Sequence, residues 1–257
     1  MRIVIKIGTS TLAHPTGHLN IRRVEELCKV ISDIKNAGHE VIIVSSGAIG
    51  MGVGKLGLRE RPTDIPTKQA AAAVGQCELM YTYDKLFSEY NHTVGQLLIT
   101  GDDVANDVRH QNFSNTLNRL LDLGAIPIIN ENDTVATDEI VIGDNDTLAA
   151  FVAESVKADK LILLSDIDGL YTADPHTHPD AKLIHVANKI DDDIIALAGG
   201  SSCSLGTGGM VTKLQAAKIC LACGCDMIIT NGNTPTNLYN ILDGKQIGTT
   251  FTEKCYD

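Results

Sequence analysis

The sequence predicts an α/β protein, a three-layer αβα sandwich with a mainly parallel central sheet. Short runs of β-branched residues alternate along the 257 residues with segments whose apolar positions repeat at helical spacing. The segments between successive strands are long enough for helical crossovers, which join parallel strands and place helices on both faces of a sheet. Twenty-three glycines, four phenylalanines and no tryptophan suit tight strand-to-helix turns better than an aromatic β-sandwich.

The first three predicted elements are a strand, a helix and a second strand. Residues 2–7 form a short apolar run of strand length, and residues 40–44 form another. Between them, Asn20 is a favourable amino-terminal cap for a helix that we expect to end near Gly38. The apolar positions of this helix step by three and four residues and are Ile21, Val24, Cys28, Ile31 and Ile34.

The remaining elements continue the alternation after a glycine-rich stretch to which no helix is assigned. Sheets of this kind bind ligands at the carboxyl ends of their strands, so candidate functional residues are sought in the turns that follow strands. The further helices are predicted at residues 69–90, 114–123, 147–156 and 210–223, and the further strands at residues 93–99, 126–129, 160–164 and 226–230.

Composition excludes several classes of protein. The formal net charge is −11, which disfavours binding to the phosphate backbone of nucleic acids, so any anion site must be local. No apolar run approaches a membrane span, and the opening apolar run is too short for a signal peptide. Seven cysteines, an odd number, favour reduced thiols. We therefore expect a soluble, cytoplasmic protein with neither a nucleic-acid nor a membrane partner.

Three cysteines near the carboxyl-terminal end allow a metal or redox interpretation. Cys220, Cys223 and Cys225 lie in or just after the helical period, and no second pair of cysteines or histidines follows at zinc spacing. Thiols that pack between a helix and its neighbours are the interpretation that we favour. No metal site is predicted.

The turn after the opening strand is the first candidate phosphate contact. Lys6 lies in a strand of otherwise apolar residues, where an ammonium group is costly unless it reaches water or an anion. Gly8 follows almost at once, and the two hydroxyl residues after it lie in a segment with free N–H groups. A lysine on an edge strand that extends into solvent is the alternative.

The turn after the second strand, residues 45–50, again offers hydroxyl groups, including that of Ser46, and backbone donors. Residues 52–57 match the G-x-G-x-x-G pattern of dinucleotide-binding folds, but the pattern does not begin at a strand end and two prolines follow. The P-loop pattern is absent as well. An ATP site in this chain would therefore lack a Walker motif.

The densest polar cluster comprises residues 130–133, Asn-Glu-Asn-Asp, and residues 143–147, Gly-Asp-Asn-Asp-Thr. Their oxygen ligands could hold a calcium ion, although the EF-hand spacing is absent. A substrate with an ammonium group and a carboxylate would use the same mixture of acids, amides and helix N–H groups. A solvated loop is the third interpretation.

Two further candidate sites follow later strands. Ser165 and Asp166 come at the end of the strand at residues 160–164. A glycine-rich loop opens the last long helix, and Lys213 in its first turn adds a point charge to the N–H groups of the helix terminus. This arrangement is typical of a phosphate cradle, and a flexible loop with a capping threonine is the alternative.

Taken together, these segments resemble the amino acid kinase family. The opening Lys-Ile-Gly-Thr-Ser separates the chain from relatives with two glycines there, such as acetylglutamate and aspartate kinases, and is similar to members that phosphorylate glutamate. We expect a single domain over residues 1–257, without the carboxyl-terminal domain, similar to RNA-modifying enzymes, that many members carry. The segments that carry the resemblance are residues 6–10, 130–133, 143–146, 169–175 and 206–217.

The resemblance implies that ATP, with Mg²⁺, phosphorylates the side-chain carboxylate of L-glutamate to give L-glutamyl 5-phosphate, the first step of proline biosynthesis. It implies that Lys6 and Lys213 are catalytic and that Asp146 orients them. The positions that match glutamate contacts are Ser46, Asp133 and Asn145. The positions that match ATP contacts are Lys6, Gly8, Ser165, Asp166, Thr207, Gly208, Gly209, Met210, Val211, Thr212 and Lys213.

The resemblance also implies a homo-oligomer, a dimer or tetramer, and feedback inhibition by proline. Three other functions stay open from the residues. The acceptor could be another carboxylate, carbamate or phosphate, as in acetylglutamate, aspartate or carbamate kinases. A non-catalytic nucleotide-binding regulator on the same fold would not need both lysines, and a Rossmann oxidoreductase would bind NAD.

Overall fold

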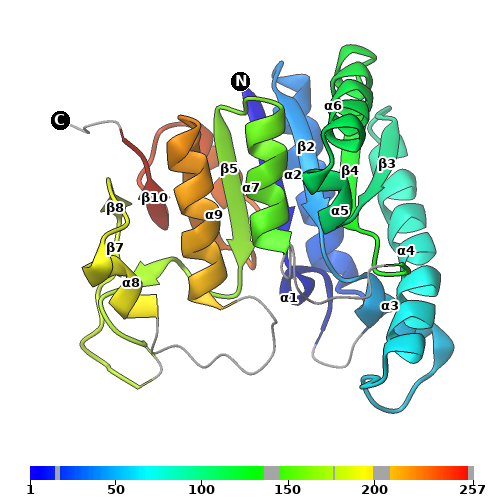
Figure 1. Cartoon of the computed structure of the whole chain (residues 1–257), viewed down its shortest axis with the longest axis horizontal. Helices are drawn as coiled ribbons and strands as arrows, with labels where there is room; N and C mark the ends of the chain where they lie inside the picture. Colours follow the sequence, from blue (N-terminus) through cyan, green and yellow to red (C-terminus); the bar gives the residue numbers. More distant parts are fainter. Residues whose placement is uncertain (15–17, 136–144, 176, 199–208, 254–257) are drawn as a thin grey trace.

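The computed structural model describes residues 1–14, 18–135, 145–175, 177–198 and 209–253. An eight-stranded sheet forms the centre of this part of the chain (Figure 1). In spatial order its strands are β3 (Val94–Ile99), β4 (Ile126–Glu131), β2 (Glu40–Ser45), β1 (Arg2–Ile7), β5 (Lys160–Ser165), β9 (Asp226–Asn231), β10 (Thr249–Phe251) and β8 (Val186–Ala187). Only the β9–β10 pair of this sheet is antiparallel among the described strands, which confirms a mainly parallel sheet.

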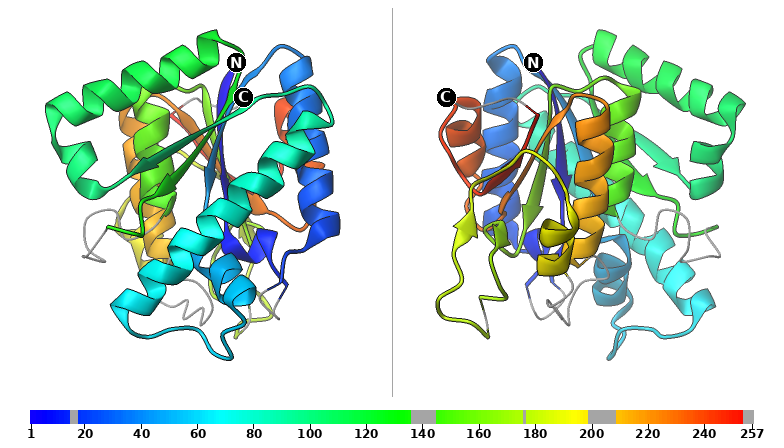
Figure 2. Two further views of the ribbon diagram at one scale, coloured as in Figure 1. Left: turned by 90° about the vertical axis from the view of Figure 1, so that its right-hand side faces the viewer. Right: turned by 60° about the vertical axis from the view of Figure 1, so that its left-hand side comes forward.

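Helices cover both faces of the sheet, as predicted (Figure 2). One face packs against α6 (Asp107–Asp122), α7 (Asn145–Ser155) and α9 (Met210–Ala222), and the other against α2 (Ile21–Asn36), α4 (Ile65–Ser88) and α10 (Asn237–Leu242). The shorter elements are α1 (Thr9–Leu12), α3 (Ala48–Leu56), α5 (Gly101–Ala105), α8 (Asp192–Ala198) and the ribbon of β6 (Leu170–Tyr171) and β7 (Leu183–Ile184). No helix in the described ranges is long and apolar enough to cross a membrane.

Alternation along β1 divides its side chains between the two cores. Val4 packs in the core beneath α7 and α9, whereas Ile3 and Ile5 pack in the core beneath α2 and α4. Because side chains alternate with period two along a strand, Lys6 points to the same face as Val4. The period of the strand therefore turns Lys6 toward α7 and α9.

Most sequence-predicted elements are confirmed to within a few residues. Asn20 caps α2, accepting a hydrogen bond from the Arg23 N–H at 3.2 Å. Ile21, predicted on the apolar face of α2, is instead 61% exposed because it occupies the first helical position.

Two helix boundaries and several unassigned helices, α3 and the shorter α1, α5, α8 and α10, correct the prediction. The glycine-rich stretch after β2 forms α3, where no helix was assigned. Helix α4 begins at Ile65, with Pro66 in its first turn, where a missing N–H costs no hydrogen bond. Helix α6 begins seven residues before the predicted start, because Asn106 caps it and accepts from the Arg109 N–H at 3.1 Å.

The glycines of α3 and α4 serve close helix packing rather than a turn. A Cβ atom on Gly52 would lie 1.8 Å from the carbonyl oxygen of Ala71, and one on Gly75 would lie 1.7 Å from that of Ala48. Real Cβ atoms do not approach backbone oxygens this closely, so only glycine allows the two helices to cross here. Helix α4 is thereby held against the first turn of α3.

We expect Gly75→Ala to lower the free energy of unfolding by about 3 kcal/mol, the upper end of the usual overpacking range, because α3 and α4 must separate. The corresponding fall in Tm is roughly 6–12 °C. Thermal unfolding followed by circular dichroism measures it. Ala73→Ser, on the exposed side of α4, is the control and should stay within about 0.5 kcal/mol. A wild-type Tm for Gly75→Ala would contradict the close contact.

Candidate active site

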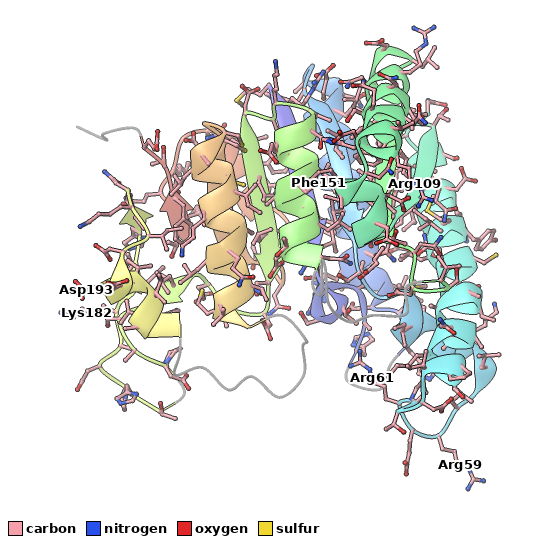
Figure 3. The ribbon with its side chains drawn as sticks, viewed as in Figure 1. Arg59, Arg61, Arg109, Phe151, Lys182 and Asp193 are labelled. Carbon is pink, nitrogen blue, oxygen red and sulfur yellow. The ribbon has the colours of Figure 1, made fainter. Side chains whose placement is uncertain are left out.

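The sequence-predicted site residues gather at one end of the sheet. Gly8, Ser46, Asp133 and Ser165 lie in or after the last residues of β1, β2, β4 and β5, and parallel strands end at the same edge. The long connection from α3 to α4 also lies at this end, and Figure 3 shows two of its exposed arginines, Arg59 and Arg61.

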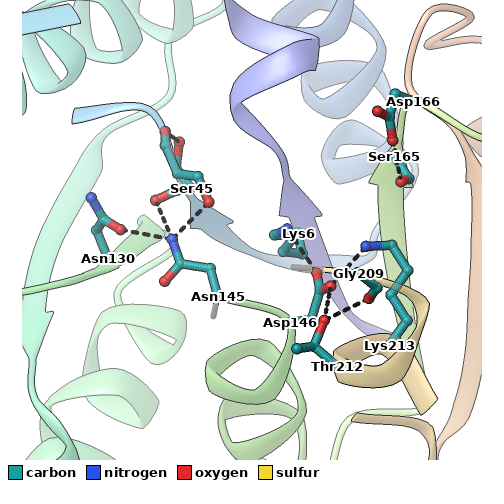
Figure 4. Close-up of polar contacts among 11 residues, drawn as sticks. Lys6, Ser45, Asn130, Asn145, Asp146, Ser165, Asp166, Gly209, Thr212 and Lys213 are labelled. Carbon is teal, nitrogen blue, oxygen red and sulfur yellow. Dashed lines mark hydrogen bonds and ion pairs between the residues drawn. The ribbon is translucent and has the colours of Figure 1, made fainter. Parts of the chain in front are cut away.

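The central feature of the site is a buried carboxylate between two ammonium groups. Lys6 Nζ lies 2.7 Å from Asp146 Oδ1, and Lys213 Nζ lies 2.9 Å from Asp146 Oδ2 (Figure 4). Asp146 is fully buried, and the lysines are only 8% and 6% exposed. Because charged groups are costly to bury without partners, each ammonium group is held in place by the same carboxylate.

Three separate elements bring these charges together. Lys6 comes from β1, Asp146 from the first turn of α7 and Lys213 from the first turn of α9. Thr212, next to Lys213, donates from Oγ1 to the carbonyl oxygen of Gly209 at 2.8 Å and lies 3.4 Å from Asp146 Oδ2. Counted over these three charged side chains, the cluster carries a net charge of +1, which suits an anionic ligand.

A second polar group lies beside the first. Asn145 donates from Nδ2 to Ser46 Oγ at 2.7 Å. The same Nδ2 donates to Asn130 Oδ1 at 3.0 Å (Figure 4). Since Asn145 directly precedes Asp146, one turn of α7 links the amide and hydroxyl group to the charged cluster. The structure thus brings Ser46 and Asn145 together, two residues separated by 99 positions.

Asp133 follows β4 and is half-buried. Burial raises the pKa of its carboxyl group above the ordinary aspartate value, because the charged form loses hydration. A carboxylate in this environment gains from a cationic ligand that replaces the lost water.

The candidate nucleotide residues divide between two strand ends and the start of α9. A Cβ atom on Gly8 would lie 3.3 Å from the carbonyl oxygen of Leu164 and 3.9 Å from Lys6 Nζ, so glycine keeps the approach to this ammonium group open. Ser165 donates from Oγ to Asp166 Oδ1 at 3.1 Å (Figure 4).

The amino terminus of α9 presents backbone N–H groups next to the charged cluster. Gly209 is the residue before the helix, and an added Cβ there would meet no atom of the described residues within 4 Å. Met210 is buried and Val211 is half-exposed. Thr207 and Gly208, also expected to contact ATP, lie outside the described residues, as do Gly143 and Asp144.

Sequence reasoning missed one residue of this region. Gln76 on α4 is 8% exposed, and its Oε1 accepts from Asn130 Nδ2 at 2.9 Å. Asn130 belonged to the predicted polar cluster, but Gln76 is 54 positions away and lies in a helix of alanines without any motif. The one available signal was a polar residue at a core-facing helical position.

The cysteines and the acids show no metal site within the described ranges. No three His, Cys, Asp or Glu side chains there are arranged to hold an ion. Cys220 and Cys225 are buried and Cys223 is exposed. Hydrogen bonding to Cys225, together with burial, raises the pKa of the Cys220 thiol. Thiols of this kind are poor nucleophiles and poor ligands at neutral pH.

Comparison with known proteins gives one matching family model and many curated relatives. The model described as the amino acid kinase family matches residues 1–231. A glutamate 5-kinase from Clostridium tetani is 55% identical over 249 residues, which is 97% of this chain and 93% of that protein. One from Listeria monocytogenes is 53% identical over 257 residues, with 98% and 93% of the two chains covered.

Solved structures of low sequence identity share the fold. The carbamate kinase from Giardia lamblia bound to AMP-PNP gives a TM-score of 0.70 at 19% identity, with 98% of both chains covered. The isopentenyl phosphate kinase of T. acidophilum, a product complex, gives 0.68 at 20% identity, with 98% of this chain and all of that chain covered.

Proposed function

The chain belongs to the amino acid kinase family, and we propose that its site transfers the γ-phosphoryl group of ATP to the side-chain carboxylate of L-glutamate. The product is L-glutamyl 5-phosphate, an acyl phosphate, and the reaction is the first step of proline biosynthesis. The observation that carries the proposal is the convergence of Lys6 and Lys213 on Asp146 at the ligand-binding end of the sheet.

The acceptor needs no general base. A glutamate side chain has an ordinary pKa of about 4.3, so at neutral pH it is already the carboxylate nucleophile. The barrier lies instead in the repulsion between this anion and the phosphates, and in the charge that spreads over the oxygens of the migrating phosphoryl group. Two ammonium groups placed at that charge lower the barrier because they are fixed before the reaction begins.

Asp146 serves as the positioning carboxylate in this proposal. Since it contacts both ammonium groups within 3 Å, it fixes the distance between them and keeps them pointed to one place. The N–H groups at the start of α9 and the open approach over Gly8 provide further contacts for phosphate oxygens. Mg²⁺ brought in with ATP would neutralise part of the phosphate charge.

The two substrates divide the site between them. We assign the nucleotide to Gly8, Ser165, Asp166 and the segment from Thr207 to Lys213, and glutamate to Ser46, Asp133 and Asn145. The support for this division is position: Asn145 and Asp146 are adjacent, so a ligand on the amide group reaches toward the ammonium groups with its far end.

Asp133→Ala is expected to raise the KM for glutamate about tenfold to a hundredfold with little change in kcat, because a charge-assisted contact to the substrate ammonium group is lost. Initial rates at varied glutamate measure this. In the wild type, KM should also rise as the pH falls through the raised pKa of Asp133, since protonation removes the charge. The alanine variant should lack this pH dependence of KM. A glutamate KM of the alanine variant equal to that of the wild type would remove Asp133 from the glutamate site.

The proposed reaction is tested by trapping its product. Incubation with ATP, Mg²⁺, glutamate and hydroxylamine should give the glutamyl hydroxamate, because hydroxylamine attacks an acyl phosphate. Parallel incubations with N-acetylglutamate, aspartate or carbamate in place of glutamate test which acceptor is used, with the rate of ADP release as the measurement. Faster ADP release with one of these three than with glutamate would reassign the substrate.

We also propose a cytoplasmic homo-oligomer that proline inhibits. The support is the family resemblance, the five free cysteines among the described residues and the position of the reaction as a first committed step, where inhibition by the end product stops the pathway before any intermediate is made. Light scattering measures the assembly, and adding proline to the hydroxamate assay measures the inhibition.

A further inference from the structure

A chain of side-chain amides runs from the inside of α4 to Ser46. Gln76 Oε1 accepts from Asn130 Nδ2 at 2.9 Å, and Asn130 Oδ1 accepts from Asn145 Nδ2 at 3.0 Å. Asn145 Nδ2 also donates to Ser46 Oγ at 2.7 Å. Gln76 and Asn130 are 8% and 2% exposed, so this end of the chain of amides is shielded from water.

The hydrogen bonds fix which way each amide points. Asn130 Oδ1 accepts from the backbone N–H of Glu131 at 2.9 Å as well as from Asn145, so this atom must be the oxygen. Asn130 Nδ2 must then face Gln76, which turns Gln76 Oε1 toward it. Each amide in the series therefore depends on the one before it.

One atom at each end of this series of amides lacks a hydrogen-bond partner. Gln76 Nε2 and Asn145 Oδ1 are both buried without a hydrogen-bond partner among the described residues. A buried donor or acceptor of this kind is costly. At Gln76 the cost of the unpaired Nε2 is offset because Oε1 accepts from Asn130 Nδ2. The resulting orientation of the Asn130 amide turns Asn145 Nδ2 toward it, which leaves Asn145 Oδ1 as an acceptor for a ligand.

Helix α4 is a rigid base for Gln76. The preceding residue, Gly75, is in backbone contact with Ala48 in the first turn of α3, two positions after Ser46. About two turns further along α4, Tyr83 Oη lies 2.9 Å from Ser45 Oγ. The same helix therefore sets the position of the serine turn from behind and the orientation of the amides beside it.

We propose that Gln76 is a positioning residue for the glutamate acceptor, acting through Asn130 on Asn145. This rests on the proposed function of the site. Without Gln76 Oε1, Asn130 Nδ2 has no partner and the amide of Asn130 can rotate. Asn145 then loses its fixed acceptor and presents its own Oδ1 to the substrate ammonium group for only part of the time.

Gln76→Met tests this, because methionine keeps the length and volume of the side chain without its acceptor. We expect the KM for glutamate to rise about tenfold, the size of one buried hydrogen bond, with kcat and the KM for ATP within about twofold of wild type. Asn118→Leu is the matched control. It also replaces a hydrogen-bonded amide, but one on α6 that bonds to Arg2 and Ser114. Its glutamate KM should stay unchanged.

A double-mutant cycle with Asn130→Ala separates positioning from general damage. In that background, Gln76→Met should leave the glutamate KM unaltered, because the residue through which it acts is gone. An equal rise in both backgrounds overturns the proposal, as does an unchanged KM in the single variant or parallel increases for glutamate and ATP.

Gln76→Asn covers the case in which Gln76→Met does not fold. It keeps a polar side chain but withdraws the amide by about 1.5 Å, one carbon–carbon bond, so the same rise in glutamate KM is expected. Failure of the wild type to form glutamyl hydroxamate would refute the proposed function instead. The two failures are thus distinguished in one set of assays.

Discussion

Lys213→Met is expected to lower kcat about a hundredfold to a thousandfold while the free energy of unfolding changes by less than about 1 kcal/mol. Methionine keeps the apolar stem that packs at the start of α9 but removes the ammonium group. The Lys6–Asp146 ion pair at 2.7 Å is left in place, so the buried carboxylate keeps a partner. Folding and catalysis should therefore separate in this one variant.

The measurement pairs initial rates at saturating ATP and glutamate with thermal unfolding of the same preparation. Lys218→Met is the control, since Lys218 is an exposed lysine on the same helix and should keep both wild-type values. A kcat within threefold of wild type would remove Lys213 from the reaction. Loss of activity in proportion to loss of folded protein would give the lysine a structural role only.

The fold could be predicted from the sequence because its signals are local. Each strand of the parallel core is a short apolar run in the sequence. Lys6 stands out as the charged residue that interrupts the first of these runs. The face to which Lys6 points follows from the period of the strand. The order of the strands does not follow, because it depends on contacts between segments far apart in the chain.

The candidate site residues could be predicted where they follow a predicted strand or belong to a motif of the family. The resemblance to a family identified Lys6, Asp146 and Lys213 as one group, and 207 positions separate the first from the last. The spacing of these residues in the sequence could not have shown that both lysines lie within 3 Å of the Asp146 carboxylate.

Gln76 and helix α3 escaped prediction for a related physical reason. The glycines of α3 lower its intrinsic helix propensity, and the stabilising contact is with a second helix, which a local pattern cannot report. Gln76 carries no motif because its role is to satisfy Asn130, a residue on a different element. Positioning residues of this kind are recognised by their partners rather than by their neighbours in sequence.

Asp146→Asn is expected to reduce both stability and activity, in contrast to Lys213→Met. Asparagine has nearly the same shape, but it leaves two buried ammonium groups close together without the carboxylate that lies between them. Removing one partner of a buried ion pair costs about 3–5 kcal/mol, or roughly 6–20 °C in Tm for a chain of this size. We also expect kcat to fall at least about a hundredfold, because the two ammonium groups no longer converge.

The double variant Lys213→Met/Asp146→Asn decides whether charge is the cause. Removing one ammonium group relieves the repulsion that the asparagine created, so the double variant should recover part of the Tm lost by Asp146→Asn alone, although it stays inactive. A double variant whose Tm falls by the sum of the two single effects would mean that the residues are independent. The carboxylate would then be a packing element of α7, and the assignment of Asp146 as the residue that holds both lysines on the phosphoryl group would fail.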